Sequence, residues 1–190
     1  MKKLLFFVLT FFSLTLFCQT SIKDKDAYIG VKGTSSVHDW NVVLKVSEIE
    51  IYQFNLKKDT LRKLELRIPV ASLEASRKSM QKKIAKALKG NDFPFLTVTL
   101  DGIRLKNDSL YATEALFTIA GKQRKLPFKC EYRLIEGKGL FLSGIQKIGM
   151  ANFEVQPPSA MFGWMKVGNE VLVNYGFFIP LKKEENQKIK

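Results

Sequence analysis

The stretch that decides the fold is residues 126–134, Leu-Pro-Phe-Lys-Cys-Glu-Tyr-Arg-Leu, in which apolar side chains alternate with mostly charged ones. Its even positions carry Leu126, Phe128, Cys130, Tyr132 and Leu134. Successive side chains of a β-strand point to opposite faces, so this alternation predicts a strand with one buried face. Cys130 falls on that face, where we expect it to pack as a small apolar residue rather than to react as a thiol.

The same alternation returns along most of the chain. It marks residues 64–70, 111–119 and 171–179 and, more weakly, residues 29–33, 42–46 and 49–56. In residues 96–105 the buried parity changes across Asp101 and Gly102, which predicts a bulge or a sharp bend. Short polar turns separate these segments, and short connections are typical of antiparallel neighbours.

One segment has helical periodicity instead. In residues 76–89 the apolar stripe consists of Met80, Ile84, Ala87 and Leu88, and Gly90 follows as a helix stop. Eight or nine antiparallel strands with one amphipathic helix indicate an all-β fold. We expect the sheet to close into a barrel, because closure removes exposed strand edges.

The first residues have the pattern of an export signal. Lys2 and Lys3 precede an uncharged apolar run, and small and polar residues follow at Cys18 and Gln19. We predict a secretory signal peptide at residues 1–19 and a periplasmic or secreted protein. The apolar run is shorter than the roughly 20 residues of a membrane-spanning helix, which disfavours an uncleaved tether. Lipoprotein attachment at Cys18 is the other alternative.

Residues 20–181 are predicted to form one barrel domain, followed by a charged tail at residues 182–190. The net charge of +13 falls to +11 when Lys2 and Lys3 leave with the signal. Export and the lack of an aromatic–basic stacking pattern argue against nucleic-acid binding. More than half of this surplus lies on the predicted helix, where a basic lip for anionic head groups would comprise Arg77, Lys78, Lys82, Lys83 and Lys86. A solvated face that keeps the protein soluble explains the same charges equally well.

The residues available for catalysis are few. His38 is the one histidine and lies beside Asp39, but adjacent side chains of an extended strand point to opposite faces. We therefore interpret His38 as a turn or strand-end residue. One histidine and one buried cysteine do not supply the ligands of a zinc site. The sequence predicts a protein that is not an enzyme and has no catalytic residues, no metal and no cofactor.

Aromatic residues gather on the predicted strands, many on faces assigned inward. A barrel of about eight strands is either filled by such side chains or wide enough for one small ligand, and composition does not decide between the two. The loop at residues 156–165 combines methionines and aromatics, which favours the mouth of an apolar pocket. The residues expected to line that pocket are Trp40, Phe54, Val98, Leu100, Phe117, Phe128, Tyr132, Phe153, Met161, Phe162, Trp164, Val173, Tyr175 and Phe177.

Four blocks resemble the YceI-like family in its Bacteroidetes-type form. The first is residues 33–40, Gly-Thr-Ser-Ser-Val-His-Asp-Trp, and the second runs from Ser72 to Leu100 with Phe93-Pro94 inside it. The third is residues 117–128, which are similar to the family's central hairpin, and the fourth is residues 153–173. Together they cover nearly the whole mature chain in order.

The resemblance implies an extended, lipocalin-like antiparallel barrel of eight strands with a long apolar cavity. It also implies an exported protein that holds a polyisoprenoid or other long-chain lipid for transport, storage or stress protection. The sequence departs from the more widespread form of the family, because Arg77 and Lys78 stand where an acidic residue is common. The alternative is an interaction module with a filled barrel that docks through its basic helix. Contact with a membrane surface and a homodimer are left open.

Overall fold

The computed structural model describes residues 20–21, 27–105, 111–156 and 167–181 of the chain. The predicted signal peptide and tail lie outside these residues, as do Met161, Phe162 and Trp164. The elements in chain order are β1 (Thr20–Ser21), β2 (Tyr28–Ser35), β3 (Trp40–Leu44), the 3-10 turn η1 (Val46–Glu48), β4 (Glu50–Lys57), β5 (Thr60–Pro69), η2 (Val70–Ser72), β6 (Leu73–Ala75), α1 (Lys78–Ala87), β7 (Phe95–Arg104), β8 (Tyr111–Ile119), β9 (Lys122–Ile135), β10 (Gly139–Gly149), η3 (Met150–Phe153) and β11 (Val167–Pro180).

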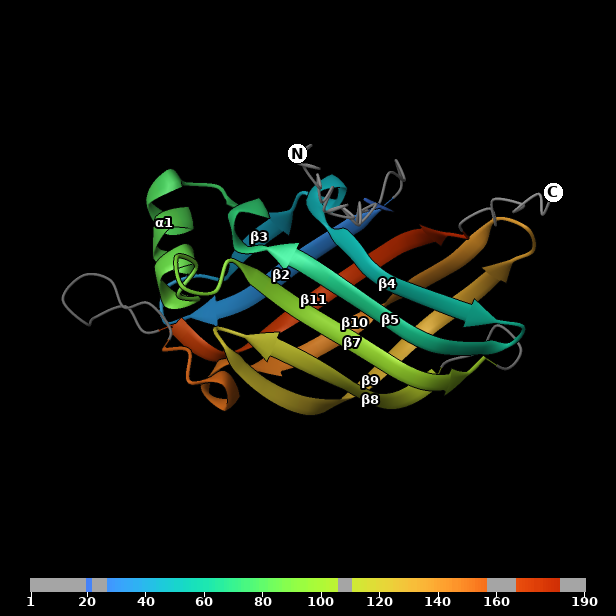
Figure 1. Ribbon diagram of the computed structural model, residues 1–190. Helices are drawn as coiled ribbons and strands as arrows, with labels where there is room; N and C mark the ends of the chain where they lie inside the picture. The colour runs from blue at the N-terminus through green and yellow to red at the C-terminus, as the bar shows by residue number, and fades with distance from the viewer. Residues whose placement is uncertain (1–19, 22–26, 106–110, 157–166, 182–190) are drawn as a thin grey trace, which may run out of the picture.

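All strands belong to one curled antiparallel sheet with α1 at one end (Figure 1). Its order is β1-β4-β5-β7-β8-β9-β10-β11-β2-β3-β6. Strands β3 and β4 are separated only by η1, and β5 and β6 only by η2, so each pair is one strand with a corner. With each pair counted once and the two-residue β1 left out, the eleven strands become the eight expected from the resemblance.

The corners allow one hairpin to join the two edges of the curled sheet. Its outer half, β4 with β5, pairs next to β7 with two register shifts between β4 and β5, whereas its inner half, β3 with β6, extends the sheet next to β2. Leu44 pairs with Leu73 across the inner half. The Lys45 amide then donates to the Ser72 carbonyl at 3.1 Å, which continues the pairing through the corner. The sheet is therefore an all-β, lipocalin-like barrel, as predicted.

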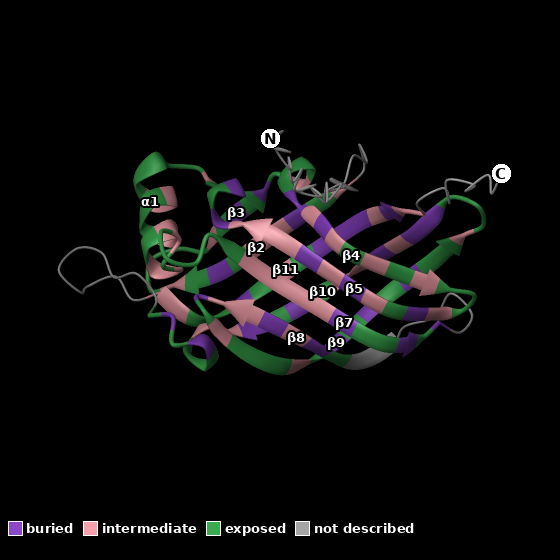
Figure 2. Cartoon of the chain, viewed as in Figure 1, coloured by how far each residue is buried: buried purple, intermediate pink, exposed green. Residues whose placement is uncertain are grey.

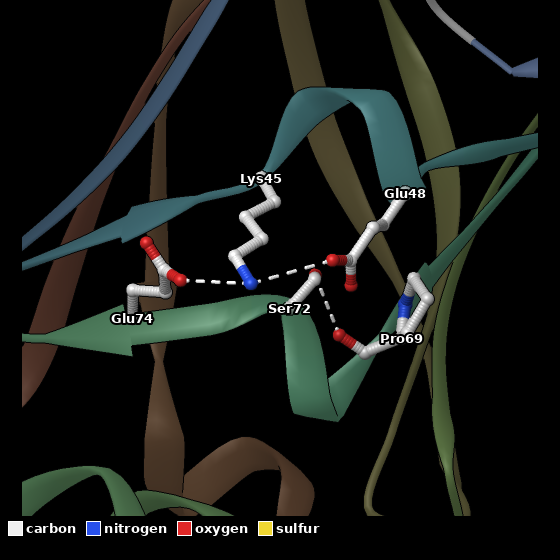
Figure 3. Close-up of polar contacts among 5 residues, drawn as sticks. All are labelled: Lys45, Glu48, Pro69, Ser72 and Glu74. Atoms are coloured by element: carbon white, nitrogen blue, oxygen red, sulfur yellow. Dashed lines mark hydrogen bonds and ion pairs between the residues drawn. The ribbon is translucent and has the colours of Figure 1, made fainter. Parts of the chain in front are cut away.

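Polar side chains fix the same corner (Figure 3). Lys45 Nζ lies 2.9 Å from Glu74 Oε1 and 3.5 Å from Glu48 Oε1. The hydrogen bond with Glu74 raises the pKa of Lys45. Ser72 is fully buried, and its hydroxyl donates to the Pro69 carbonyl at 2.7 Å. The buried hydroxyl is thus satisfied locally, which a corner inside an apolar barrel requires.

Burial alternates along the strands, as Figure 2 shows. On β9 the side chains of Phe128, Cys130 and Tyr132 are buried, while Lys129 and Glu131 between them are exposed. Burial raises the pKa of the Cys130 thiol to about 11, so the thiol stays protonated at neutral pH. The interpretation of Cys130 as a buried apolar residue is confirmed.

The helix is shorter than predicted and ends differently. It spans Lys78–Ala87 rather than residues 76–89, and Lys89, not Gly90, takes the left-handed conformation at φ 52°. The Gly90 amide donates to the Ala85 carbonyl at 2.8 Å, which completes the helix end. A Cβ on Gly90 would lie 3.0 Å from Val70, so glycine is needed here for close packing.

The change of parity in residues 96–105 is a bend without an inserted residue. The register between β5 and β7 does not shift, and Gly102 has φ 66°. Leu100 and Ile103 are both buried, and their partners Leu64 and Leu61 on β5 are buried with the same spacing. Both strands therefore bend together. Of the two alternatives predicted for this position, the sharp bend is confirmed and the bulge is wrong.

Strand β10 is absent from the segments predicted by alternation. Its inward face includes Gly144 and the buried Gln146, whereas Ile145 points outward and is 63% exposed. At residues 145 and 146 the apolar and the polar side chain thus occupy the faces opposite to those that a sequence pattern assumes.

Candidate functional site

The interior of the barrel contains an apolar cavity, which we call the inner cavity. Its volume is about 120 Å³. Its polar lining residues are Thr97, Gln146 and Tyr175, and the Gln146 amide nitrogen donates to the Lys147 carbonyl at 2.9 Å. Seven of the predicted pocket residues line it: Val98, Leu100, Phe117, Phe128, Val173, Tyr175 and Phe177.

A second apolar cavity, the outer cavity, lies beneath α1 and has a volume of about 140 Å³. The helix contributes its apolar stripe, including Met80 and Ile84, and Trp40 and Phe153 line it as predicted. The two cavities share six lining residues, namely Val31, Leu73, Leu96, Ile119, Ile148 and Val173. They are consecutive parts of one apolar space, which we call the tunnel.

The tunnel adjoins a larger polar cavity of about 300 Å³ at the start of α1. Trp40, Met80 and Val167 line both the outer and the polar cavity, so the two are adjacent. The polar cavity is lined from α1 and the residues before it by Ser76, Arg77, Ser79 and Lys83. The end of β2 contributes Ser35, and the loop before β3 contributes His38 and Asp39.

This arrangement divides the predicted basic lip. Arg77 and Lys83 line the polar cavity, whereas Lys78, Lys82 and Lys86 are exposed and line none of the three cavities. The sequence did not predict that Arg77 and Lys83 line one cavity together with Ser76, Ser79 and Asp39. A signal was present, because residues 76, 79, 80 and 83 follow the spacing of one helical face and all line this cavity.

Trp40 is positioned between the outer and polar cavities by two contacts. Its indole nitrogen donates to the Thr34 carbonyl at 3.2 Å. Its ring lies over Gly33, where a Cβ would fall only 2.2 Å from the ring. Glycine at this position of β2 therefore permits the indole to lie flat across the strand.

Four aromatic rings end the tunnel on the side away from α1, and we call them the aromatic floor. The ring centroids of Phe117 and Phe128 lie 6.4 Å apart, those of Phe128 and Tyr175 lie 5.9 Å apart in a stack, and those of Tyr175 and Phe177 lie 5.9 Å apart. Burial raises the pKa of the Tyr175 hydroxyl, which approaches the Lys129 carbonyl at 3.5 Å. Each ring of the floor contacts at least one other ring of the floor, so the four rings form one continuous aromatic cluster.

Two predicted pocket residues fall outside the tunnel. Tyr132 is buried on β9, where it pairs with Leu142 of β10, and Phe54 on β4 packs against the core as a half-buried residue. Neither lines the inner or the outer cavity. Both lie on strands with the correct alternation, but the part of the barrel interior that they occupy is filled.

The local chemistry around His38 is that of a turn. The Ser35 hydroxyl donates to the His38 carbonyl at 2.6 Å and accepts from the His38 amide at 3.1 Å. Ser35 thus bonds to the backbone of the turn. Over the ranges that the structure describes, no group of three His, Cys, Asp or Glu side chains could hold a metal ion. Within the same ranges, the helix is too short and too polar to span a bilayer.

The fold and the tunnel can be compared with known proteins. No family model matches the sequence, and no curated protein matches it either. Among solved structures, Burkholderia cenocepacia BcnA is similar at a TM-score of 0.67 and 13% identity, over 84% of this chain and 99% of that one. A YceI protein of Campylobacter jejuni is similar at a TM-score of 0.60 and 15% identity, over 75% of this chain and 85% of that one. This chain has the YceI fold.

A third solved structure is similar to this chain as well. It is described as a polyisoprenoid-binding domain from Saccharophagus degradans and matches at a TM-score of 0.65 and 11% identity, over 83% of this chain and 95% of that one. The resemblance stated from the sequence is confirmed at the level of the fold. The Bacteroidetes-type form of the YceI-like family stays a prediction.

Proposed function

We propose that this protein binds a polyisoprenoid or other long-chain amphiphile, with the tail in the tunnel and the head group in the polar cavity. The observation that supports this most is the sequence of the three cavities, apolar, apolar and polar, each sharing lining residues with the next. A molecule with one apolar and one polar end matches that order. The similar domain that is described as polyisoprenoid-binding supports the same class of ligand.

Apolar burial is sufficient for useful affinity. Ten methylene groups at about 0.8 kcal/mol each yield about 8 kcal/mol before the cost of immobilising the ligand. The tunnel offers little competing polarity, because the surface that faces both apolar cavities is apolar. Binding therefore does not depend on strong polar contacts, and the polar cavity selects the head group rather than supplying most of the affinity.

The charges of the polar cavity favour an anionic head group. Arg77 and Lys83 bring two positive charges, and Asp39 brings one negative charge. The hydroxyl groups of Ser76 and Ser79 add hydrogen-bond donors on the same side. A carboxylate or phosphate uses such donors well, because hydrogen bonds to ionised groups are the stronger ones.

The basic residues that point away from the cavity suit a second role. Lys78, Lys82 and Lys86 are exposed on α1, and no acidic residue lies within the helix. We include in the proposal that this face contacts anionic membranes, where each lysine near the surface contributes about 1 kcal/mol. The rival interaction module would use the same face with a protein partner and would need no tunnel.

We further propose that binding takes place outside the cytoplasm, after removal of the signal at residues 1–19, and that the role is transport, storage or stress protection without a catalytic step. The support is the apolar run behind Lys2 and Lys3. N-terminal sequencing of the exported protein tests the cleavage. A mature chain that still begins at Met1 would reject the export part of the proposal.

Native mass spectrometry of the purified protein, with extraction of bound lipid, tests ligand binding directly. We expect either a co-purified amphiphile or uptake of a fluorescent fatty acid at micromolar concentration. A protein that is free of ligand and takes up no fluorescent fatty acid would reject the proposal and favour the interaction module.

A charge-matched pair of variants tests the head-group site. The double variant Arg77→Ser, Lys83→Ser should weaken a carboxylate- or phosphate-headed amphiphile about tenfold, since it removes charge-assisted hydrogen bonds. Lys82→Ser, Lys86→Ser removes the same charge from the same helix outside the cavity and should leave that affinity unchanged. It should instead weaken binding to anionic vesicles. Equal loss of amphiphile binding in both variants would contradict the placement of the head group.

A further inference from the structure

The barrel is hollow over only part of its length. Near α1 the inward side chains of Ile68, Leu96 and Val98 line the inner cavity and are half-buried. Farther along the same strands, Leu61 and Ile103 are almost fully buried and line neither apolar cavity. The half of the barrel away from α1 is therefore filled.

The aromatic floor separates the hollow half from the filled half. Its rings come from β8, β9 and β11, so they extend across a large part of the sheet. Tyr175 lies flat against β10, where a Cβ on Gly144 would approach the tyrosine hydroxyl to 2.8 Å. Beyond the floor, Leu140 and Ile179 have no exposed surface. A tail that reaches the rings has no space ahead of it.

The distance from the mouth of the tunnel to the floor can be measured along two strands. On β11 the tunnel begins at Val167 and reaches the floor at Tyr175. Along β10 it begins at Met150, the first residue of η3, and reaches Gly144, opposite Tyr175. These segments rise about 20–26 Å at about 3.3 Å per residue. With the strand tilt of about 40° that is usual in barrels, the tunnel is about 15–20 Å deep.

That depth corresponds to a limited number of carbons. An extended hydrocarbon chain advances about 1.25 Å per carbon, since its bonds are about 1.5 Å long and meet at near-tetrahedral angles. The tunnel thus accepts about 12–16 carbons in an extended chain. Longer chains must leave their remainder in the polar cavity or in water.

We propose that the aromatic floor sets the length of the bound chain, and that the occupant is a single chain of about 12–16 main-chain carbons, such as a fatty-acyl tail or an isoprenoid of three or four units. This inference rests on the proposed function. The inference goes beyond the proposed function because it predicts a maximum length for the bound chain. A barrel that is hollow throughout would instead take chains of any length up to that of the barrel.

Competition against a bound fluorescent fatty acid tests the cutoff. The competitors are saturated carboxylic acids of 8 to 22 carbons. Each acid is kept below the concentration at which it aggregates. Below the cutoff each added methylene should raise the affinity about fourfold, which corresponds to about 0.8 kcal/mol per methylene. Above about 16 carbons the affinity should stop rising. An unbroken rise to 22 carbons would overturn the inference while leaving the proposed function intact. Absence of binding at every length would reject both.

Shortening one ring of the floor should move the cutoff. Phe128 contacts both Phe117 and Tyr175, so Phe128→Ala should open the floor and shift the cutoff by two to four carbons. Phe128→Leu is the milder variant and should shift it by one or two carbons if the alanine variant does not fold. Leu140→Ala removes buried volume beyond the floor and should leave the cutoff in place. A shift in the Leu140 variant, or none in either Phe128 variant, would show that the floor does not measure the chain.

Discussion

Replacing Val173 by tryptophan is expected to divide the tunnel into two separate cavities. Val173 lies on β11 and lines both the inner and the outer cavity, so an indole at this position occupies the passage between them. The adjacent residue, Leu172, points to the opposite face and is 46% exposed. Leu172→Trp therefore adds the same side chain to the same strand without entering the tunnel, and it is the matched control.

The expected loss of binding free energy follows from the number of methylene groups that the indole excludes from the inner cavity. If the inner cavity holds about half of a chain of 12–16 carbons, some six to eight methylenes are excluded, which amounts to about 5 kcal/mol at 0.8 kcal/mol each. Even if rearrangement recovers half of this, binding weakens about a hundredfold. Added bulk in a packed core often costs about 1–3 kcal/mol of stability, but here the ring enters empty space, so the cost should be at the lower end.

Titration with a fluorescent 16-carbon acid measures the affinity, and urea denaturation verifies that both variants are folded. We expect Val173→Trp to bind about a hundredfold more weakly than the unmodified protein and Leu172→Trp to bind within about threefold of it. A folded Val173 variant with undiminished affinity would show that the tail does not pass from the outer to the inner cavity, and the tunnel would lose its assigned role.

Two further predictions concern stability. Gly33→Ala should lower the free energy of unfolding by about 1–3 kcal/mol, because its Cβ would overlap the ring of Trp40; urea denaturation should show no such loss for Gly30→Ala, where nothing lies within 4 Å of the added carbon. Stability should also fall as the pH rises above about 9, because burial raises the pKa values of Cys130 and Tyr175 and the unfolded chain then releases protons that the folded chain retains. For Cys130 the loss is about 1 kcal/mol at pH 10, over a window from its ordinary 9.0 to about 11. Tyr175→Phe should remove the tyrosine part of the slope, and an identical slope in that variant would contradict the assignment.

The sequence by itself determined the class of the fold and most of its strands. The period of two in residues 126–134 already assigns Phe128, Cys130 and Tyr132 to one buried face, because the direction of a side chain along a strand depends only on local geometry. The apolar stripe of α1 could be predicted for the same reason. Strand β10 could not be predicted from alternation, because Ile145 faces outward and Gln146 faces inward. Its position depends on pairing with its neighbours β9 and β11.

Only the tertiary structure decided what the buried faces enclose. Tyr132 and Phe128 have the same orientation on β9, yet one lies in the filled half and the other forms the floor, because the outcome depends on which side chains meet from β8 and β11. The polar cavity likewise joins His38 to Lys83 through the pairing of distant segments. Alternation specifies the side of the sheet, whereas the volume between opposite walls depends on register, curvature and close approaches at glycines, none of which a local pattern contains.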